Sequence, residues 1–397
     1  MPQLPKVTIQ NLKLTRFRNH GLASFDFIDG VNLIVGPNGS GKTNILEAIN
    51  LLSTGKSFRA RYDQEMILNP QIPHHNEDSG GVAAFASRVP DLAAHDTSRR
   101  DAPPPSPDRE FCRVCGTVSD DSSEEALEII IVKSGPYTNF SQKTFKVNGT
   151  SKPIYETTRY FSTVLFCPQD LDLFNGSPAL RRKFLDDLLC KVDQKYKKEH
   201  TTYSKAVRQR NKVLEKINKM GSGGAGRGGD ELSFWTDEIL KTGAYLQEKR
   251  TELVQTLNNN IGQAYSDVSS QDTKVDLEYK MNQINLERLQ KHHEHEIYAK
   301  TTLVGPHRDD LEFLINGFSI ARYGSRGQQR TGVLALKICE LNIIGQKNAT
   351  SPVLLLDDIF SELDNAHKKA LEEVVRRQQT IITSTHPDIK AQSVITL

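Results

Sequence analysis

The chain has 397 residues and a formal net charge of +2, with 37% hydrophobic and 25% charged residues. This length is enough for one large or two ordinary domains, each with its own core. No run of about 18 apolar residues is present, and the first ten residues lack the apolar core of a signal peptide. Composition thus excludes a membrane span and a membrane partner, and it predicts a cytoplasmic protein.

The five cysteines are scattered, which is typical of a protein from a reducing compartment. Only Cys112 and Cys115 have the spacing of a zinc ligand pair, and no second pair accompanies them. They lie in Phe111–Val118, whose alternating pattern favours a β-strand over a metal site. The cluster His292, His293, Glu294 and His295 has two interpretations, a metal site or a polar helix surface, and the polar surface is favoured.

The first third of the chain reads as strands around one helix. The strand from Phe25 ends at a glycine-rich turn, after which apolar residues repeat at helical spacing from Ile45 to Leu52. Residues 70–108 are rich in Pro, Asp, Ser and Arg, which predicts a disordered insertion. Asn148 and Gly149 form a favoured hairpin turn. The predicted strands are Val7–Phe17, Phe25–Val35, Leu127–Lys133 and Lys143–Val147.

From Ser177 to Lys300 the signals are nearly all helical, and the glycine-rich stretch 221–229 separates two long segments that we expect to fold back as a hairpin. A mixed pattern follows to the end of the chain. The predicted elements there are a strand pair (Leu311–Ile315 and Phe318–Ala321), a helix (Gln328–Ile344), a strand (Val353–Leu356), a helix (Ala366–Arg377) and a strand (Thr380–Ser384).

A complete phosphate-binding loop follows the strand that ends at Val35. The segment matches G-x-x-x-x-G-K-[ST] and opens a helix near Asn44, the setting in which this motif binds ATP or GTP. Glycines let backbone N–H groups converge on phosphate oxygens, while the lysine reaches the β- and γ-phosphates and the threonine offers its hydroxyl to Mg²⁺. The loop consists of Gly36, Pro37, Asn38, Gly39, Ser40, Gly41, Lys42 and Thr43.

The acidic partner of this loop comes much later in the chain. The apolar strand Val353–Leu356 ends on Asp357 and Asp358, which is the Walker B form. Asp357 suits the Mg²⁺ shell, and Asp358 suits polarisation of the water that attacks the γ-phosphate. An Asp-Asp pair at a strand end is otherwise an ordinary solvated turn, but beside a phosphate loop the catalytic interpretation is favoured.

Ser325, Gly327 and Gln328 form the Ser-x-Gly-Gln core of an ABC-type signature at the start of a helix. The serine hydroxyl and the N–H groups of the helix end can face an anion. The chain resembles ABC-type ATPases, in which this surface faces the γ-phosphate held by a second protomer, and the resemblance implies an ATP-dependent homodimer. The plain alternative is a serine that only caps its helix.

Three shorter features agree with this resemblance. Ser361–Asp364 matches the D-loop that crosses the dimer interface, and His386 occupies the place of the switch histidine after a strand. Gln169 is the candidate Q-loop residue. An exposed loop histidine remains the alternative for His386, and an ordinary polar residue remains the alternative for Gln169.

Positive charge is concentrated between Arg181 and Met220, where 13 Lys and Arg face 5 Asp and Glu, a local charge of +8. Five of these residues share one helix face, which predicts phosphate contacts without base readout, although a solvated face is the plain alternative. They are Lys205, Arg208, Lys212, Lys216 and Lys219. Lys56, Arg59 and Arg61 form a weaker second candidate patch.

Several longer motifs together resemble the RecF family of bacterial recombination-repair ATPases, over almost the whole chain outside the insertion. The departures are Arg326 for Gln, Gln169 for Glu, His386 for Thr or Asp, and the insertion itself. The motifs are Leu14–Asn19, Gly36–Arg59, Phe166–Leu171, Gly176–Pro178, Arg181–Asp186, Gln209–Asn211, Val304–Asp310, Ser325–Arg330 and Leu354–Asp364.

The resemblance implies an α/β ABC-type ATPase head without a long coiled coil. Lobe I would span 1–175 and 346–397, and a mainly helical lobe II would span 176–345. The resemblance adds Arg18 and Asn19 to the nucleotide site. It also implies an ATPase of DNA replication, recombinational gap repair and the SOS response, which binds single-stranded and duplex DNA at gaps and helps RecO and RecR load RecA.

Two rival functions have weaker support. An SMC-like or Rad50-like structural ATPase would carry hundreds of coiled-coil residues, whereas the helical region here has only about 120 residues and contains a glycine-rich interruption. An ABC transporter motor would need a membrane-domain partner and a transporter signature. The Gly-Pro-His-Arg-Asp-Asp sequence at 305–310 is instead characteristic of the RecF family.

Overall fold

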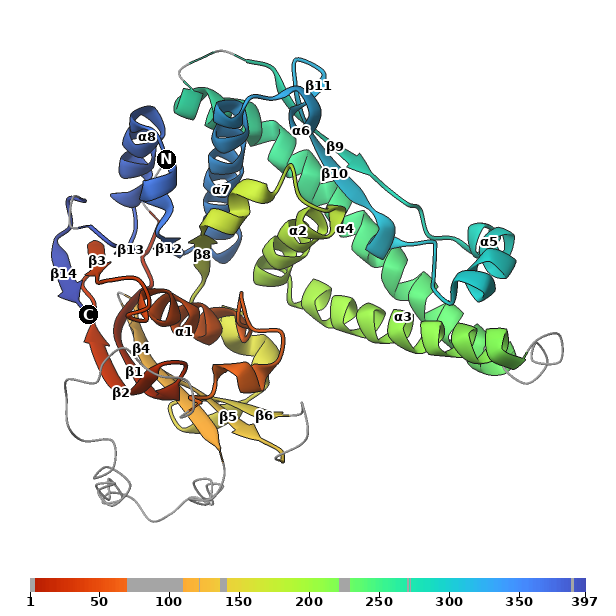
Figure 1. Ribbon diagram of the computed structural model, residues 1–397, viewed down its shortest axis with the longest axis horizontal. Helices are drawn as coiled ribbons and strands as arrows, with labels where there is room; N and C mark the ends of the chain where they lie inside the picture. The colour runs from red at the N-terminus through yellow and green to blue at the C-terminus, as the bar shows by residue number, and fades with distance from the viewer. Residues whose placement is uncertain are drawn as a thin grey trace. The chain divides into compact units, whose positions relative to one another are not determined.

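The computed structural model describes residues 4–69, 110–120, 122–135, 141–220, 229–269, 271, 273–386 and 389–397 (Figure 1). The chain divides into two compact units. The P-loop unit comprises Thr8–Thr157 and Ile381–Leu397, and the signature unit comprises Met1–Val7 and Thr158–Thr380. The lobes at 1–175, 176–345 and 346–397 stay predictions. Among the described residues, no helix has the length and apolarity needed to cross a membrane.

Two sequence predictions concern segments outside the described residues. The first is the disordered insertion at 70–108, and the second is the flexible connection at 221–229, of which the structure describes only Gly229, the first residue of a helix.

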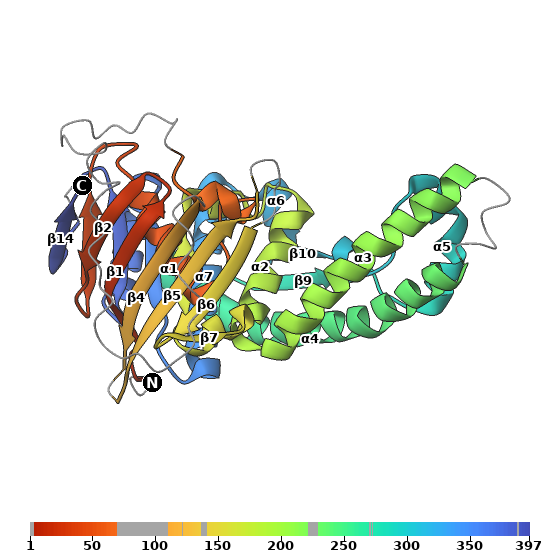
Figure 2. The same cartoon turned by 90° about the horizontal axis from the view of Figure 1, so that it is seen from below.

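The P-loop unit is built on a six-stranded antiparallel sheet in the order β2-β1-β4-β5-β6-β7 (Figure 2). Asn148 and Gly149 join β6 to β7 with φ of 49° and 77°, as expected for the tight hairpin turn that these residues predict. The strands are β1 (Thr8–Phe17), β2 (His20–Asp26), β4 (Phe111–Ser119), β5 (Glu124–Lys133), β6 (Ser141–Val147) and β7 (Thr150–Lys152).

The strand interpretation of Cys112 and Cys115 is confirmed, because both lie on β4. Successive side chains of a strand alternate between its faces, so residues three apart point to opposite sides. Cys112 is buried and Cys115 is partly exposed, and burial raises the pKa of the Cys112 thiol to about 12. In the described part of the chain, no three His, Cys, Asp or Glu side chains are grouped so as to hold a metal ion.

The strand predicted from Phe25 to Val35 is in fact two strands. β2 ends at Asp26 and β3 spans Val31–Val35, with Gly30 between them at φ 146°. β3 pairs in parallel with β14 (Ser393–Thr396) and leads through the phosphate loop into α1 (Lys42–Thr54). A Cβ on Gly116 of β4 would lie 2.8 Å from Leu52 Cδ1, so this glycine permits the close packing of α1 on the sheet.

The signature unit contains a parallel pair formed by β8 and β12, and β12 carries the Walker B carboxylates at its end. The predicted helices and strands of this region are confirmed with small shifts at their ends. They are α7 (Arg326–Asn348), β12 (Val353–Asp357) and α8 (Asn365–Val375), together with β13 (Thr380–Ser384), which lies in the P-loop unit from Ile381 on. The strand β8 (Thr163–Phe166) was not predicted.

The expected helical hairpin is confirmed. α3 and α4 run side by side and form an arm in the signature unit (Figure 2). On α4, Leu232, Ile239, Leu246 and Leu253 are all buried and spaced seven residues apart, the repeat of a coiled coil, and Leu232 forms a buried cluster with Val213, Leu214 and Ile217 of α3. The helices of this part are α2 (Pro178–Val192), α3 (Gln194–Met220), α4 (Gly229–Ser269) and α5 (Leu286–Ala299).

The prediction that 177–300 is nearly all helical is wrong at β9 (Val275–Lys280). Its sequence, Val-Asp-Leu-Glu-Tyr-Lys, alternates as a half-buried strand does, and β9 forms a three-stranded sheet with β10 (Asp310–Ile315) and β11 (Phe318–Ser319). The strand predicted to reach Ala321 ends at Ser319, because α6 (Ile320–Tyr323) begins there.

Candidate functional site

The phosphate loop lies between β3 and α1 in the P-loop unit. Gly39 and Gly41 have φ of 87° and 102°, a left-handed conformation that side chains rarely adopt. Lys42 is 8% exposed, and its Nζ donates to the carbonyl oxygens of Gly36 at 2.7 Å and Pro37 at 2.9 Å. The loop thereby curls around its own lysine ammonium and presents a compact positive centre at the start of a helix.

Ser40 gives an independent indication that this loop accommodates a ligand. Its Oγ is buried, and within the described residues it has no hydrogen-bond partner. A buried hydroxyl without a partner costs free energy, and such groups call for a specific explanation. A phosphate oxygen would satisfy the Ser40 hydroxyl, so the residues present fit a polyphosphate ligand.

Asn19 lies directly against the loop. A Cβ at Gly41 would approach the amide group of Asn19 to 2.6 Å, and Asn44 Nδ2 donates to Asn19 Oδ1 at 2.6 Å. His20 Nε2 lies 3.3 Å from the Gly41 carbonyl oxygen. Burial lowers the pKa of His20, although its contact with Gly41 opposes that shift. The structure therefore brings Asn19 to the loop, as the sequence resemblance implied.

Glu47 is a functional candidate that sequence reasoning missed. Its side chain is fully buried in α1, where it accepts from Arg18 and Arg59 and, through a short hydrogen bond, from Ser57. Burial alone would raise its pKa, but these donors hold it below its usual value. The sequence did contain a signal for Glu47, a carboxylate inside the mostly apolar stretch 45–52, since acidic residues are rarely buried without partners.

The Walker B residues lie at the end of β12. Asp357 is 7% exposed, and Asp358 follows it with φ of 49°, a left-handed conformation at a non-glycine residue. Such backbone strain persists where the surrounding structure enforces it, often at functional sites. Ser361 Oγ donates to the Asp358 carbonyl oxygen at 2.7 Å and fixes the turn that follows.

Ser325 is the N-cap of α7 in the signature unit. Its Oγ accepts from the Gln328 backbone N–H at 3.2 Å, and Gln328 Oε1 accepts from the Ser325 N–H at 2.9 Å. Ser325, Gly327 and Gln328 are nevertheless all exposed. The hydroxyl proton of Ser325 is not needed for this cap, so capping and anion binding are compatible roles.

Of the remaining nucleotide-site candidates, Thr43 is partly buried, and Gln169 and His386 are exposed. Gln169 lies in a 3-10 helix, Pro168–Asp172, of the signature unit. His386 follows β13 in the P-loop unit, and its backbone N–H donates to Ser384 Oγ at 3.1 Å. Asp364, at the end of the predicted D-loop, caps α8 by accepting from the His367 N–H at 3.0 Å.

The five basic residues predicted to share a face of α3 are all exposed along this one helix. Two of them approach carboxylates: Lys216 lies 3.4 Å from Glu231, and Lys219 lies 2.7 Å from Glu215. Lys205, Arg208 and Lys212 are the other three.

Part of the local +8 charge is neutralised inside the signature unit. Arg181 pairs with Asp310, Lys191 with Glu340 and Arg210 with Glu296. In the P-loop unit, Lys56 is exposed, whereas Arg59 donates to Glu47 at 2.8 Å. Arg59 therefore has a structural contact besides its predicted role toward DNA.

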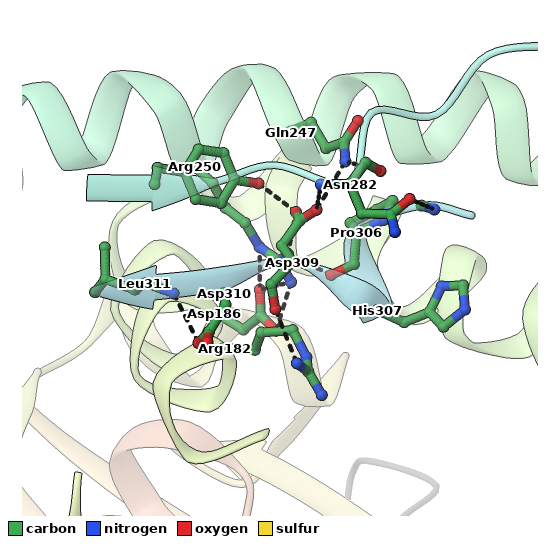
Figure 3. Close-up of polar contacts among 12 residues, drawn as sticks. Arg182, Asp186, Gln247, Arg250, Asn282, Pro306, His307, Asp309, Asp310 and Leu311 are labelled. Carbon is green, nitrogen blue, oxygen red and sulfur yellow. Dashed lines mark hydrogen bonds and ion pairs between the residues drawn. The ribbon is translucent and has the colours of Figure 1, made fainter. Parts of the chain in front are cut away.

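The family motif at 305–310 lies within a buried polar network (Figure 3). Asp309 is fully buried and accepts from Arg250 at 2.9 Å and from Gln247 at 3.0 Å. Arg250 also pairs with Asp186 at 2.8 Å. Burial would raise the pKa of Asp186, but His200 and Arg250 lower it to about 2. The network joins α2 and α4 to the loop before β10, which indicates an architectural role for the motif.

Comparisons with known proteins agree with this arrangement. A family profile described as an AAA domain matches residues 11–372. The DNA replication and repair protein RecF of Roseiflexus castenholzii is 33% identical over 96% of this chain and 94% of its own length. RecF of Moorella thermoacetica is also 33% identical, over 96% of this chain and 91% of its own.

Solved structures give the same result. The recombination mediator protein RecF-ATPrS in the RecFOR pathway superposes with a TM-score of 0.81 and 28% identity, over 100% of this chain and 98% of that chain. The corresponding RecF-ATP structure gives a TM-score of 0.78 and 29% identity. The mixed α/β ATPase fold is thus shared along the whole chain. The chain belongs to the RecF family of DNA replication and repair proteins.

Proposed function

We propose that this protein is an ATPase that uses ATP binding and hydrolysis to control its grip on DNA during replication and recombinational gap repair. The observation that carries the proposal is the phosphate loop, with the Lys42 ammonium held at its centre and the Ser40 hydroxyl buried and without a partner among the residues that the structure describes. Family membership and the AAA-domain match support ATP as the nucleotide.

Each part of the loop has a proposed task. The N–H groups of 36–43 and the N-terminus of α1 would hold the phosphates, with Lys42 at the β- and γ-phosphates and Asn19 and Arg18 beside the loop. Thr43 and Asp357 would bind Mg²⁺, which supplies charge neutralisation at the phosphates. Oxygen ligands of this kind are the ones that Mg²⁺ prefers.

Hydrolysis requires a group that orients water. We assign that role to Asp358, whose carboxylate follows the Mg²⁺ ligand in the sequence, and we assign the sensing of the γ-phosphate to Gln169 and His386. A slow turnover suits a protein whose nucleotide state serves as a switch.

The signature residues serve a second copy of the chain. The exposed Ser325 hydroxyl, with Gly327 and Gln328 at the N-terminus of α7, would bind the γ-phosphate of the partner's ATP. Two chains would then enclose two ATP molecules, and dimer formation would depend on ATP. Binding of ATP stabilises the dimer only to the extent that the dimer binds ATP more tightly than the monomer does.

DNA would lie on the exposed basic face of α3, with Lys205, Arg208, Lys212 and Lys216 at its phosphates and Lys56 and Arg59 as a secondary patch. Such contacts bind single-stranded and duplex DNA without sequence preference, as recognition of a gap requires. The similar solved structures are of recombination mediator proteins of a RecFOR pathway. This similarity supports RecO and RecR as partners of the present chain, a role in RecA loading and the SOS response, and a cytoplasmic location.

A binding assay on gapped, single-stranded and duplex DNA, with and without ATP, tests the proposal. Fluorescence anisotropy should show tighter binding with ATP, strongest on gapped DNA, and Lys42→Ala should remove the ATP effect while keeping the basal affinity. Lys13→Ala, an exposed lysine on β1, is the matched control. Equal affinities with and without ATP for the unaltered protein would contradict the proposal.

A further inference from the structure

A continuous chain of polar contacts connects the signature to the D-loop. Thr331 Oγ1 lies 3.0 Å from the carbonyl oxygen of Gly327, one turn earlier in α7, and 2.8 Å from His367 Nε2 on α8. His367 Nδ1 in turn lies 2.7 Å from Asp364 Oδ1. Gly327 belongs to the Ser-x-Gly-Gln signature, and Asp364 is the last residue of the D-loop.

The proton positions follow from the chemistry of these groups. An ionised carboxylate only accepts hydrogen bonds, so His367 Nδ1 must carry a proton and donate to Asp364. In a neutral ring, Nε2 then accepts from the Thr331 hydroxyl, whose single proton is shared with the Gly327 carbonyl. Asp364 also accepts from the His367 backbone N–H at 3.0 Å, so two bonds fix its carboxylate.

The order Thr-His-Asp has the distances of a nucleophile triad, but its burial excludes that role. Thr331 is 5% exposed and His367 is 7% exposed, so no substrate reaches the threonine hydroxyl. The two ends of the chain of contacts are instead exposed, at Gly327 and at Asp364. The buried contact between Thr331 and His367 can therefore hold the exposed signature and the exposed D-loop at a fixed distance and orientation.

A second contact links the same two segments. Arg330 Nη2 of α7 lies 3.8 Å from Glu362 Oε2 of the D-loop, both partly exposed. An exposed ion pair of this length contributes little by itself. The buried contacts through His367 must therefore carry most of the restraint between the signature helix and the D-loop.

We propose that Thr331 and His367 are positioning residues that lock the signature and the D-loop into one preorganised surface for the second copy of this chain. The inference rests on the proposed ATP-dependent dimer and names the residues that prepare its partner-facing side. Preorganisation lowers the cost of ordering these segments when the dimer forms. Loss of the lock should weaken the dimer while each chain still binds ATP in its own phosphate loop.

Thr331→Val tests the proposal because it removes the hydroxyl and nearly preserves the shape. Sedimentation velocity with ATP should show a dimer dissociation constant raised about five- to tenfold, consistent with one lost buried hydrogen bond. ATP binding to the monomer, measured by equilibrium dialysis at low protein concentration, should remain unchanged. The turnover number should fall with little change in KM, and Thr331→Ser should restore dimerisation.

Thr242→Val is the matched control, because Thr242 is 1% exposed on α4 and its hydroxyl bonds the carbonyl one turn earlier at 2.6 Å. It should lose similar thermal stability and keep normal dimers. His367→Asn retains an acceptor and donor near Asp364 but cannot reach Thr331. Its dimer dissociation constant should therefore rise as much as that of Thr331→Val. The variant with both substitutions should dimerise no more weakly than either single variant.

Three outcomes separate the hypotheses. Normal ATP-induced dimers in Thr331→Val and His367→Asn overturn the positioning role and leave the proposed function standing. Equal loss of dimers in Thr242→Val reduces the effect to general stability and also overturns it. Absence of ATP-induced dimers in the unaltered protein overturns the dimer model itself, together with the positioning role.

Discussion

The guanidinium of Arg18 spans both carboxylate oxygens of Glu47, with Nε 2.9 Å from Oε2 and Nη2 2.6 Å from Oε1. A bidentate pair of this kind fixes orientation as well as distance. Because Arg18 follows β1 and Glu47 lies in α1, the pair ties the first strand to the helix that the phosphate loop opens. Arg59 completes the arrangement by donating to both Glu47 and Asn44.

We predict that Glu47→Gln destabilises the protein strongly and weakens ATP binding. The substitution leaves two guanidinium groups without their buried carboxylate, a change that typically costs about 3–5 kcal/mol. Urea unfolding measures the loss, and equilibrium dialysis measures ATP affinity. Glu128→Gln is the control, since Glu128 pairs with the half-exposed Arg113 and should cost about 1 kcal/mol or less. Equal losses in both variants would refute the special role of Glu47.

Asp358→Asn should form ATP-bound dimers that release DNA slowly. Asparagine tolerates the left-handed conformation that residue 358 adopts, so the turn after β12 should survive. The amide cannot serve as the carboxylate that orients water, and ATP should therefore remain unhydrolysed. Light scattering with ATP measures dimers, and a competitor chase measures DNA release. Failure of this variant to dimerise would count against the sandwich arrangement.

Ser325→Arg should bind ATP and remain monomeric, because a long cation would replace the small hydroxyl at the partner-facing end of α7. The variant also loses an N-cap, which costs about 1 kcal/mol. Asn285→Ala isolates that cost, since Asn285 caps α5 by accepting from the Arg288 N–H at 2.8 Å. The control should lose similar stability and dimerise normally. Dimers of normal strength in Ser325→Arg would remove Ser325 from its assigned role.

Much of the local structure was predictable from the sequence. The phosphate loop, the Walker B strand and the Asn148-Gly149 turn each depend on short patterns whose geometry is fixed by neighbouring residues. The hairpin of α3 and α4 likewise follows from helical periodicity on either side of a glycine-rich break. β9 was missed because its six residues lie between helices. The apolar and polar residues of β9 alternate as in a strand, but the whole region was interpreted as helical from its surroundings.

The contacts between distant residues were not predictable. Nothing in the sequence says that Arg210, counted among the basic residues of α3, pairs with Glu296 in the core while Lys212 stays exposed. The same holds for Thr331 and His367, which are 36 residues apart. Net charge and helical spacing describe single elements, whereas tertiary packing decides which charges are neutralised and which side chains meet.

Replacing Lys205, Arg208 and Lys212 with glutamine should weaken DNA binding and flatten its dependence on salt. Each lost phosphate contact should lower the slope of log K against log salt by about 0.7 to 0.9. Titrations at several salt concentrations measure this slope. The control replaces Lys249, Lys274 and Lys280, lysines of the same unit that pair with nearby carboxylates. An unchanged slope in the first variant would exclude this face of α3.

His307 should make the protein less stable as the pH falls from 7 to 5. Its Nδ1 lies 2.7 Å from the Tyr203 hydroxyl and its Nε2 lies 2.9 Å from the Thr302 carbonyl oxygen. Burial, aided by nearby arginines, lowers the pKa of His307 to about 4. The unfolded chain, with a histidine pKa of about 6.5, binds more protons across this interval, so stability must rise with pH.

The expected loss between pH 7 and pH 5 is about 2 kcal/mol from this group. Urea unfolding of the unaltered protein and of His307→Asn at both pH values isolates it, because the other histidines contribute equally to both proteins. The variant should be less stable at pH 7, where it loses the contact with Tyr203, and should show a smaller decline toward pH 5. An equal decrease in the free energy of unfolding of both proteins would mean that His307 takes up its proton as readily in the folded state as in the unfolded state. That result would contradict a neutral, buried His307 ring.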